Sequence, residues 1–311
     1  MSNSGPTLPT NRAPTQRCDA GSVHDSQGSL GIVQPGQRWV RGSAPSPTLG
    51  EPIDHWVLLP ASYDGERRFA TLHLLHGRGE DLHAWTRVAP ALDAMVQRGD
   101  VPPLLVVLPD APWSHRASFY VDSRFTGDPP GRPVETAVVG DLVAHVDATY
   151  RTLADREHRF VGGCSMGGAG ALRLVLAHDE VFSGALVLSP AVYVPLPPAA
   201  SSTRVSGAFG RGGQRFLDAT YQELSHVGLL AGHDPARPVR LALAVGDAEW
   251  RHPDPVDARH DVDRETAAVH ALAQRTPGVV SRLRVLPGGH DWDLWERAFV
   301  DGLPFVVGAA S

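Results

Sequence analysis

The chain has 311 residues, 42% of them hydrophobic and 20% charged, which is the composition of a globular protein with a large core. A formal net charge of −6 without a basic stretch argues against nucleic-acid binding, and no apolar run approaches the ~20 residues of a membrane span, so neither partner is expected. All 28 basic residues are arginine, which excludes Schiff-base and other lysine-dependent chemistry.

The first residues differ in composition from the rest. Residues 1–20 are mostly Ser, Pro, Thr, Asn and Gly, which predicts a disordered tail, and they lack the apolar stretch of a signal peptide. We therefore expect a cytoplasmic protein in which residues 21–311 form a single α/β domain. The two cysteines, Cys18 and Cys164, are too few for a disulfide framework or a zinc site, so both are expected to be free thiols.

Short apolar runs, separated by stretches with helical periodicity, follow from residue 38 onward. The first two runs are expected to form an antiparallel entry to a sheet. The predicted strands are Arg38–Arg41, Asp54–Leu59, Ala70–Leu75, Leu104–Leu108, Arg159–Gly162, Ala185–Leu188, Leu241–Val245 and Leu283–Leu286. The predicted helices are Leu82–Gln97, Glu135–Tyr150, Gly168–Ala177, Arg264–Gln274 and Asp291–Phe299. This alternation predicts a mostly parallel sheet with helices on both faces.

Residues 193–233 interrupt the alternation, because they are first rich in Pro, Ser and Gly and then only weakly helical. An irregular insertion between two strands predicts a lid or a pocket wall. Its glycines, Gly207, Gly210, Gly212 and Gly213, do not have the spacing of a dinucleotide-binding loop and follow no clear strand. No cofactor is therefore expected.

The strongest motif is the segment from Gly163 to Gly168, with the sequence GCSMGG. It follows a predicted strand and opens a predicted helix, which is the setting of a nucleophile elbow with Ser165 exposed on a sharp turn. A glycine-rich turn with an idle serine is the alternative, and the flanking strand and helix disfavour it. Cys164 is interpreted as a small buried residue rather than as the nucleophile.

Acyl transfer needs two hydrogen-bond donors for the oxyanion of its tetrahedral intermediate. The first is expected to be the backbone N–H of Met166, the residue after the serine. The second is expected from the turn that follows the strand ending at Leu75, in the sequence LLHGRG. His76 in this turn is interpreted as structural, because the base follows the serine along the chain in this arrangement.

His290 is the expected general base, because it lies on a Gly-Gly loop directly after the last predicted strand. The acid that orients it should follow the preceding strand, where both Asp247 and Glu249 could accept the imidazole N–H. Spacing alone leaves these two open. Trp292 and Trp295 are interpreted as core anchors of the final helix, with substrate stacking as the alternative.

A run of acidic and histidine side chains raises the question of a metal site. Its members are His252, Asp254, Asp257, His260, Asp261 and Asp263. Their spacing fits no defined site, and an aspartate that caps the next helix is the simpler interpretation. No metal is expected.

Four segments together, GCSMGGAGAL, LLHGRGED, VLPDAPWSHRASFYVDS and PGGHDW, resemble the “putative esterase” family of α/β-hydrolases. That family includes esterase D (S-formylglutathione hydrolase), mycolyltransferases and enterochelin-esterase-like proteins. The resemblance implies an α/β-hydrolase fold with a lid-like insertion. It also implies Ser165 as nucleophile, His290 as base, and an oxyanion hole formed by Met166 with the Gly77–Arg78 turn.

The resemblance has three further implications. The acid of the family commonly lies three residues after the glycine at the strand end, which favours Glu249 over Asp247. A similar SFYVDS segment lines the site in relatives, so Tyr120 and Asp122 are expected pocket residues. Cys164 stands where relatives usually have an aromatic or aliphatic residue, which implies an altered pocket floor.

These residues favour a serine carboxylesterase that acts on a small-molecule ester or thioester through an acyl-enzyme. An acyltransferase, or an enzyme that forms or opens lactones, would use the same residues. A silent hydrolase fold that only binds a ligand is the remaining alternative, and it would need none of the three catalytic side chains.

Overall fold

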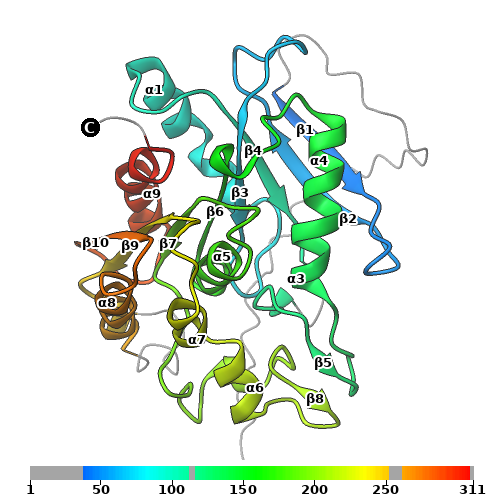
Figure 1. Cartoon of the computed structure of the whole chain (residues 1–311), viewed down its shortest axis with the longest axis vertical. Coiled ribbons are helices and arrows are strands. Elements are labelled where there is room, and N and C mark those ends of the chain that lie inside the picture. Colours follow the sequence, from blue (N-terminus) through cyan, green and yellow to red (C-terminus); the bar gives the residue numbers. More distant parts are fainter. Residues whose placement is uncertain (1–37, 112–115, 252–260, 309–311) are drawn as a thin grey trace, which may run out of the picture. The chain divides into compact units, whose positions relative to one another are not determined.

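The computed structural model describes residues 38–111, 116–251 and 261–308, and its main element is an eight-stranded sheet within these ranges (Figure 1). The strands lie in the order β1-β2-β4-β3-β6-β7-β9-β10. Their bounds are β1 (Trp39–Ala44), β2 (Ile53–Leu58), β3 (Ala70–Leu75), β4 (Leu104–Pro109), β6 (Arg159–Cys164), β7 (Gly184–Leu188), β9 (Val239–Gly246) and β10 (Val279–Leu286). The predicted tail, residues 1–20, and Cys18 lie outside the described residues.

The sheet is mostly parallel, as predicted. β2 pairs antiparallel with both β1 and β4, and every other pairing in this sheet is parallel. Each predicted strand coincides with one of these strands to within a few residues. The central strands β3, β4, β6 and β7 are buried along their whole length, which explains their unbroken apolar runs.

Helices cover both faces of the sheet, and each face has its own apolar cluster. One cluster includes side chains of α4, α5 and α8, and the other includes those of α1 and α9, which lie close together in Figure 1. The helices are η1 (Ala84–Val88), α1 (Ala89–Arg98), α3 (Val134–Thr136), the π-helical η2 (Ala137–Leu142), α4 (Val143–Thr149), η3 (Arg156–His158), α5 (Met166–Ala177), η5 (Glu249–Arg251), α8 (Val262–Ala273) and α9 (Trp292–Val306).

The segment between β7 and β9 contains the predicted insertion. Its elements are η4 (Ser202–Arg204), β8 (Arg211–Gly212), α6 (Asp218–Glu223) and α7 (His226–Ala231). β8 pairs with the short strand β5 (Arg124–Phe125), and these lie with α6 at one end of the view in Figure 1. α7 packs on α5 and α8, so the insertion is fastened to the helices that cover the sheet.

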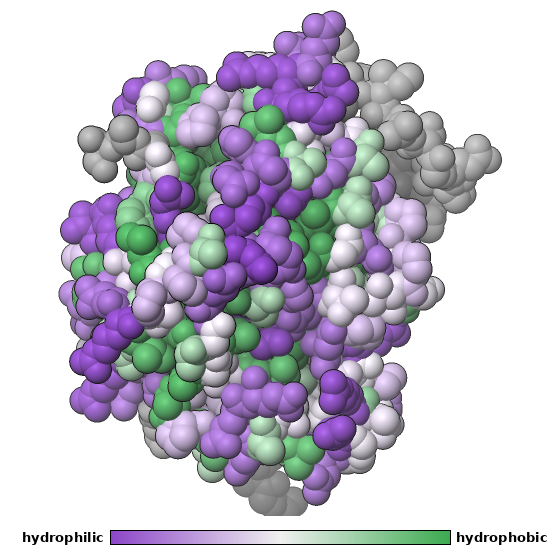
Figure 2. All heavy atoms as spheres, viewed as in Figure 1, coloured by the Kyte–Doolittle hydropathy of each residue, from purple (hydrophilic) through white to green (hydrophobic). Residues whose placement is uncertain are grey.

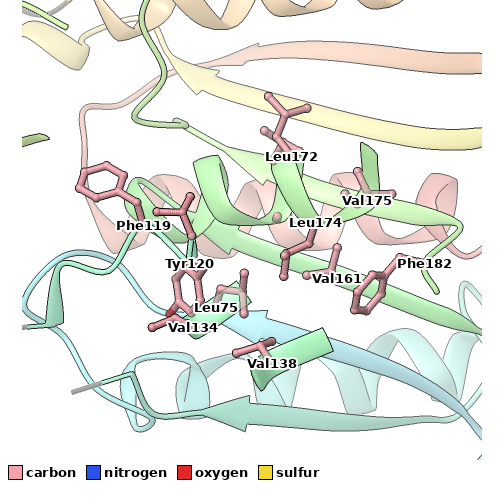
Figure 3. Packing of buried hydrophobic residues seen from close by; sticks show 14 of the residues in the cluster. Leu75, Phe119, Tyr120, Val134, Val138, Val161, Leu172, Leu174, Val175 and Phe182 are labelled. Carbon is pink, nitrogen blue, oxygen red and sulfur yellow. The ribbon is translucent and has the colours of Figure 1, made fainter. Parts of the chain in front are cut away.

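The core is built around α5, which packs on β6 and β7. Figure 3 shows the Leu174 side chain of this helix close to Val161, with Phe182 beyond it, and these residues are buried in one cluster with Leu172 and Val175. Burying such a side chain contributes about 1.5–3 kcal/mol, so the helix that starts at the candidate nucleophile is firmly held. On the face seen in Figure 2, hydrophobic residues are scattered among hydrophilic ones. No helix in the described ranges is long and apolar enough to span a membrane.

Two buried histidines make the stability of the fold sensitive to acid. Burial lowers the pKa of His55 to about 4, and burial together with the charge of Arg159 lowers the pKa of His73 to about 3. Neither ring nitrogen of His73 has a hydrogen-bond partner among the described residues. Both side chains must therefore stay neutral in the folded state.

We expect the free energy of unfolding to fall as the pH drops below about 6.5, where histidine takes up a proton in the unfolded chain. Each of the two histidines then costs about 3 kcal/mol by pH 4, because its pKa is far lower in the native state than in the unfolded chain. Urea unfolding at pH 7 and pH 4 measures the loss. His73→Leu should remove about 3 kcal/mol of it, whereas His83→Gln, at an exposed side chain, should not. A His73→Leu variant as acid-sensitive as the wild type would contradict this account.

Candidate active site

Ser165 lies on a sharp turn between β6 and α5, at the carboxyl end of the parallel strands. Its φ of 54° and ψ of −117° lie outside the regions that serine ordinarily adopts. The turn is held by backbone hydrogen bonds from the Ser165 N–H to the Leu188 carbonyl, at 2.9 Å, and from the Ala169 and Ala191 N–H groups to the Ser165 carbonyl, both at 3.0 Å. These bonds hold an unfavourable backbone conformation that presents the side chain, which is the geometry of a nucleophile elbow.

Two glycines make this turn sterically feasible. A Cβ on Gly163 would overlap the backbone of Gly167, and a Cβ on Gly167 would overlap the Leu75 carbonyl group of β3. The strand, the turn and the helix therefore approach each other more closely than side chains allow. The G-x-S-x-G pattern is explained by this close approach.

His290 and Glu249 form a buried pair on the loops after β10 and β9. The Nδ1 of His290 lies 2.7 Å from Oε2 of Glu249. The side chains of both are less than a tenth exposed. A carboxylate in this position holds the imidazole so that the other ring nitrogen, Nε2, can accept a proton. The ring of Trp295 meets the His290 ring edge-on at 5.0 Å and restricts its orientation further.

The second oxygen of Glu249 is held by two other donors. The hydroxyl of Ser189 donates to Oε1 at 2.6 Å, and the Gly246 N–H donates to it at 2.9 Å. Ser189 in turn accepts a hydrogen bond from the indole N–H of Trp295 at 3.1 Å. Burial alone would raise the pKa of Glu249, but the hydrogen bonds from His290, Ser189 and Gly246 hold it below its ordinary value. Glu249 is thus a buried carboxylate that remains ionised.

Asp247 occupies a different position from Glu249. Its Oδ1 accepts the Gly288 N–H at 3.0 Å, and its own N–H donates to the Leu286 carbonyl at 2.9 Å. These bonds tie the end of β9 to the loop that carries His290. Of the two acids that the sequence left open, Glu249 is the one paired with the histidine.

Ser165 and His290 face one cavity of about 340 Å³. Aromatic side chains form much of its wall, and Tyr193, Ser202 and Thr203 come from the segment between β7 and β9. The full lining is Gly77, Arg78, Glu80, Phe119, Ser165, Met166, Ala191, Tyr193, Ser202, Thr203, Val262, His290, Asp291, Trp292 and Trp295. Trp292 and Trp295 therefore both anchor α9 and border the cavity. That residues 193–233 act as a lid stays a prediction.

All three expected oxyanion-hole residues border this cavity, but they are not equivalent. The N–H of Gly77 donates to Oε2 of Glu80 at 2.7 Å, so it is already engaged. The other oxygen of Glu80 accepts the indole N–H of Trp292 at 2.9 Å. The Gly77 N–H is thus engaged within its own turn. That Met166, Gly77 and Arg78 form the oxyanion hole stays a prediction.

The three expected pocket residues do not border the cavity. Tyr120 is fully buried, with its hydroxyl 3.2 Å from the His76 carbonyl oxygen, and its neighbour Phe119 lines the cavity instead. Asp122 does not border this cavity, and its carboxylate accepts hydrogen bonds from the N–H and the hydroxyl of Thr136 at the end of α3. Cys164 is fully buried, and burial raises the pKa of its thiol well above the ordinary value, so it is not a thiolate.

The acidic and histidine run is only partly visible. Residues 252–260 lie outside the described residues, and the described Asp261 stands at the N-terminus of α8 without a capping hydrogen bond from its side chain. Within the described part of the chain, no group of three or more His, Cys, Asp or Glu side chains is arranged to hold a metal ion.

Sequence reasoning missed three residues of this site: Glu80, Phe119 and Ser189. Glu80 accepts a hydrogen bond from the indole N–H of Trp292, which lies 212 residues away in the sequence, so only the folded structure reveals this contact. Ser189 directly follows β7, and a polar residue at the end of a parallel strand was the available sign.

Comparison with known proteins relates this chain to esterases. The sequence profile of the family described as “Putative esterase” matches residues 46–306. An endo-1,4-beta-xylanase/feruloyl esterase of Xylanibacter ruminicola is 27% identical over 147 residues, which are 45% of this chain and 20% of that protein. An iron(III) salmochelin esterase of Escherichia coli O6:H1 is 25% identical over 312 residues, covering 97% of this chain and 62% of that protein.

The chain spans less than two thirds of the length of either of these curated relatives. A solved ferulic acid esterase matches the fold with a TM-score of 0.69 at 25% identity, and the match covers 87% of this chain and 97% of that one. The α/β-hydrolase fold implied by the sequence motifs is thereby confirmed. Since the family profile extends from before β2 to the last turn of α9, the chain belongs to the family described as “Putative esterase”.

Proposed function

We propose that the chain is a serine carboxylesterase that works through an acyl-enzyme on Ser165. One observation carries the proposal: Ser165, on its strained turn, and His290 border the same cavity, and His290 is paired at 2.7 Å with the buried carboxylate of Glu249. Membership of an esterase family supports the same conclusion. Binding alone would require none of these features.

In the proposed mechanism the Ser165 hydroxyl attacks the ester carbonyl while Nε2 of His290 takes its proton. The oxyanion accepts hydrogen bonds from the N–H groups of Met166 and Arg78. Each such donor contributes about 10²–10³ in kcat. The N-terminus of α5 adds its positive end to this stabilisation.

Collapse of the tetrahedral intermediate breaks the bond to the leaving alcohol, and His290 returns its proton to that oxygen. Water then attacks the acyl-enzyme while His290 takes a proton from it, which forms a second tetrahedral intermediate. Its collapse breaks the bond to the Ser165 oxygen, which receives the proton from His290, and releases the carboxylic acid. Throughout, the ionised Glu249 stabilises the imidazolium form of His290.

The cavity supports an uncharged, apolar or aromatic acyl group as the substrate class. Its walls include Phe119, Tyr193, Trp292 and Trp295. Aromatic walls of this kind contact flat rings favourably, by stacking or edge-to-face packing. Two relatives named as feruloyl or ferulic acid esterases are consistent with an aromatic acid.

Hydrolysis of p-nitrophenyl acetate and of methyl ferulate, in the presence and absence of methanol, tests the proposal. We expect release of p-nitrophenol or ferulic acid, with water as the main acceptor. A methyl ester as the main product from p-nitrophenyl acetate would indicate an acyltransferase. Absence of turnover on every ester would overturn the esterase assignment.

Ser189→Ala should slow hydrolysis about tenfold or more, because a hydrogen bond to a buried charged group is lost. Without this donor the Glu249 carboxylate becomes more basic and stabilises protonated His290. The acid limb of the kcat/KM profile should therefore move to higher pH. Trp295→Phe removes the donor to Ser189 but keeps an aromatic ring beside His290 and leaves the Ser189 bond to Glu249 in place, so its effect should be smaller. An unchanged pH profile in Ser189→Ala would refute this positioning role.

A further inference from the structure

A second, smaller cavity of about 40 Å³ lies beside the first and shares two lining residues with it, Phe119 and Ala191. Apart from these shared walls, it is bordered by α5, by residues 192–226 and by Val121. Most of this lining is apolar, for example Leu172 and Phe209. Its volume by itself leaves room for about one water molecule. The small cavity, which we call the annex, is thus separated from the main cavity by the Phe119 side chain and Ala191.

The annex begins close to the candidate nucleophile. Ala169 and Leu172 line it, and they lie four and seven residues after Ser165, on the same face of α5. Ala191, the other shared wall, donates its backbone N–H to the Ser165 carbonyl at 3.0 Å. An acyl group bound to Ser165 that extends along this face of α5 would therefore point toward the annex.

Phe119 is held firmly in its dividing position. It and Tyr120 have positive φ angles of 51° and 54°, a backbone conformation that only a well-packed site maintains. Tyr120 is anchored by its hydroxyl to the His76 carbonyl oxygen at 3.2 Å, and it packs so tightly on α5 that a Cβ on Gly170 would lie 2.6 Å from Cδ2 of its ring. Figure 3 shows the two rings pointing in different directions from this turn. Phe119 also meets the Phe209 ring at 5.4 Å.

The polar groups that border the annex do not make it a charged site. Arg173 is paired with Glu135 at 2.6 Å and donates to the Leu224 carbonyl at 2.8 Å. Burial lowers the pKa of His226 to about 4, so its imidazole is neutral at pH 7. The space behind Phe119 is therefore suited to hydrocarbon rather than to an ion.

We propose that Phe119 is a specificity-determining residue that closes the acyl side of the active-site cavity and thereby limits the length of the acyl group. This inference rests on the proposed esterase function. If the phenyl ring is removed, the main cavity and the annex become continuous, and longer acyl chains gain an apolar channel along α5.

The test is the kcat/KM of p-nitrophenyl esters from acetate to dodecanoate for the wild type and for Phe119→Ala. Alanine keeps the Cβ, so the backbone strain at this position is unchanged. Because Phe119 lines the substrate cavity, the kcat/KM for each ester is expressed relative to the value that the same protein gives with acetate. For longer esters, each methylene newly buried in the variant should raise its kcat/KM about fourfold relative to the wild type.

Val121→Ala is the matched control, because Val121 is buried, lines only the annex and does not separate the two cavities. Its chain-length profile should equal that of the wild type. A uniform loss on all esters in Phe119→Ala, or the same lengthening in Val121→Ala, would overturn the proposal. Acetate esters of alcohols from methanol to dodecanol form a second series. If the kcat/KM of Phe119→Ala rises with chain length in this series only, the annex lies on the alcohol side and its assignment to the acyl side is overturned.

A binding measurement separates this proposal from the esterase proposal. The Tm of both proteins is measured in the presence of 1-butanol, 1-hexanol and 1-decanol, which contain no ester that could be hydrolysed. The increase in Tm should grow with chain length more steeply in Phe119→Ala than in the wild type. Equal increases in Tm in the two proteins would overturn the proposal that Phe119 separates the main cavity from the annex, even if neither protein hydrolyses an ester.

Discussion

Ser165→Ala is expected to lower kcat/KM for p-nitrophenyl acetate by about 10⁴-fold or more, to near the background rate. The reason is that the hydroxyl is the nucleophile that forms the acyl-enzyme, and no other side chain takes that role in the proposed mechanism. The fold should persist, since the turn is held by backbone hydrogen bonds to Leu188, Ala169 and Ala191, and alanine keeps the Cβ. Far-UV circular dichroism and Tm verify this.

Ser183→Ala is the matched control for the nucleophile. Ser183 is buried, whereas Ser165 is partly exposed at the cavity. Ser183 directly precedes β7, and its hydroxyl lies 3.4 Å from the Glu157 carbonyl oxygen, at the opposite end of the strand from the cavity. This variant should retain wild-type activity. Wild-type turnover in Ser165→Ala would remove the serine from the mechanism.

Glu249→Gln should reduce kcat by about 10³–10⁴-fold, because a neutral amide neither fixes the imidazole tautomer nor stabilises the imidazolium. The 2.7 Å contact with Nδ1 of His290 is the basis of this expectation. The shape of the side chain is preserved, so the effect should lie in kcat more than in KM. Steady-state kinetics with p-nitrophenyl acetate measure it.

Asp247→Asn is the paired variant at the other acid. Its amide oxygen can still accept the Gly288 N–H, so the loop that carries His290 should keep its place. We expect a change of less than about tenfold in kcat. A larger loss in Asp247→Asn than in Glu249→Gln would transfer the role of the acid to Asp247.

Much of the fold and several site residues could be predicted from sequence because each depended on a local pattern. Strand β3 is buried throughout and reads as an unbroken apolar run, so its predicted and observed bounds coincide. Ser165 lies in a glycine pattern flanked by a predicted strand and a predicted helix, which is the setting of a nucleophile elbow, and His290 follows the last strand. The prediction of one helix over Glu135–Tyr150 was less accurate, because the structure has the π-helical stretch Ala137–Leu142 between α3 and α4.

Other features depended on contacts that no local pattern encodes. The resemblance of the SFYVDS segment to the family implied Tyr120 as a pocket residue, but Phe119 and Tyr120 both have positive φ angles, and here Phe119 lines the cavity while Tyr120 is fully buried. Gly77 was expected to supply an oxyanion donor, yet its N–H is engaged by Glu80. Glu80 is positioned by Trp292 from the start of α9, at the other end of the domain sequence.

The most direct test of the central claim is to trap the acyl-enzyme. The protein is mixed with p-nitrophenyl acetate, quenched in acid within the first turnovers and digested with trypsin. Since the chain has no lysine, cleavage after Arg159 and Arg173 gives a peptide of residues 160–173 in which Ser165 is the only hydroxyl. This account predicts an acetyl group on that serine, located by fragment ions. An acetyl group on Cys164 or on another peptide, or turnover without any adduct, would contradict it.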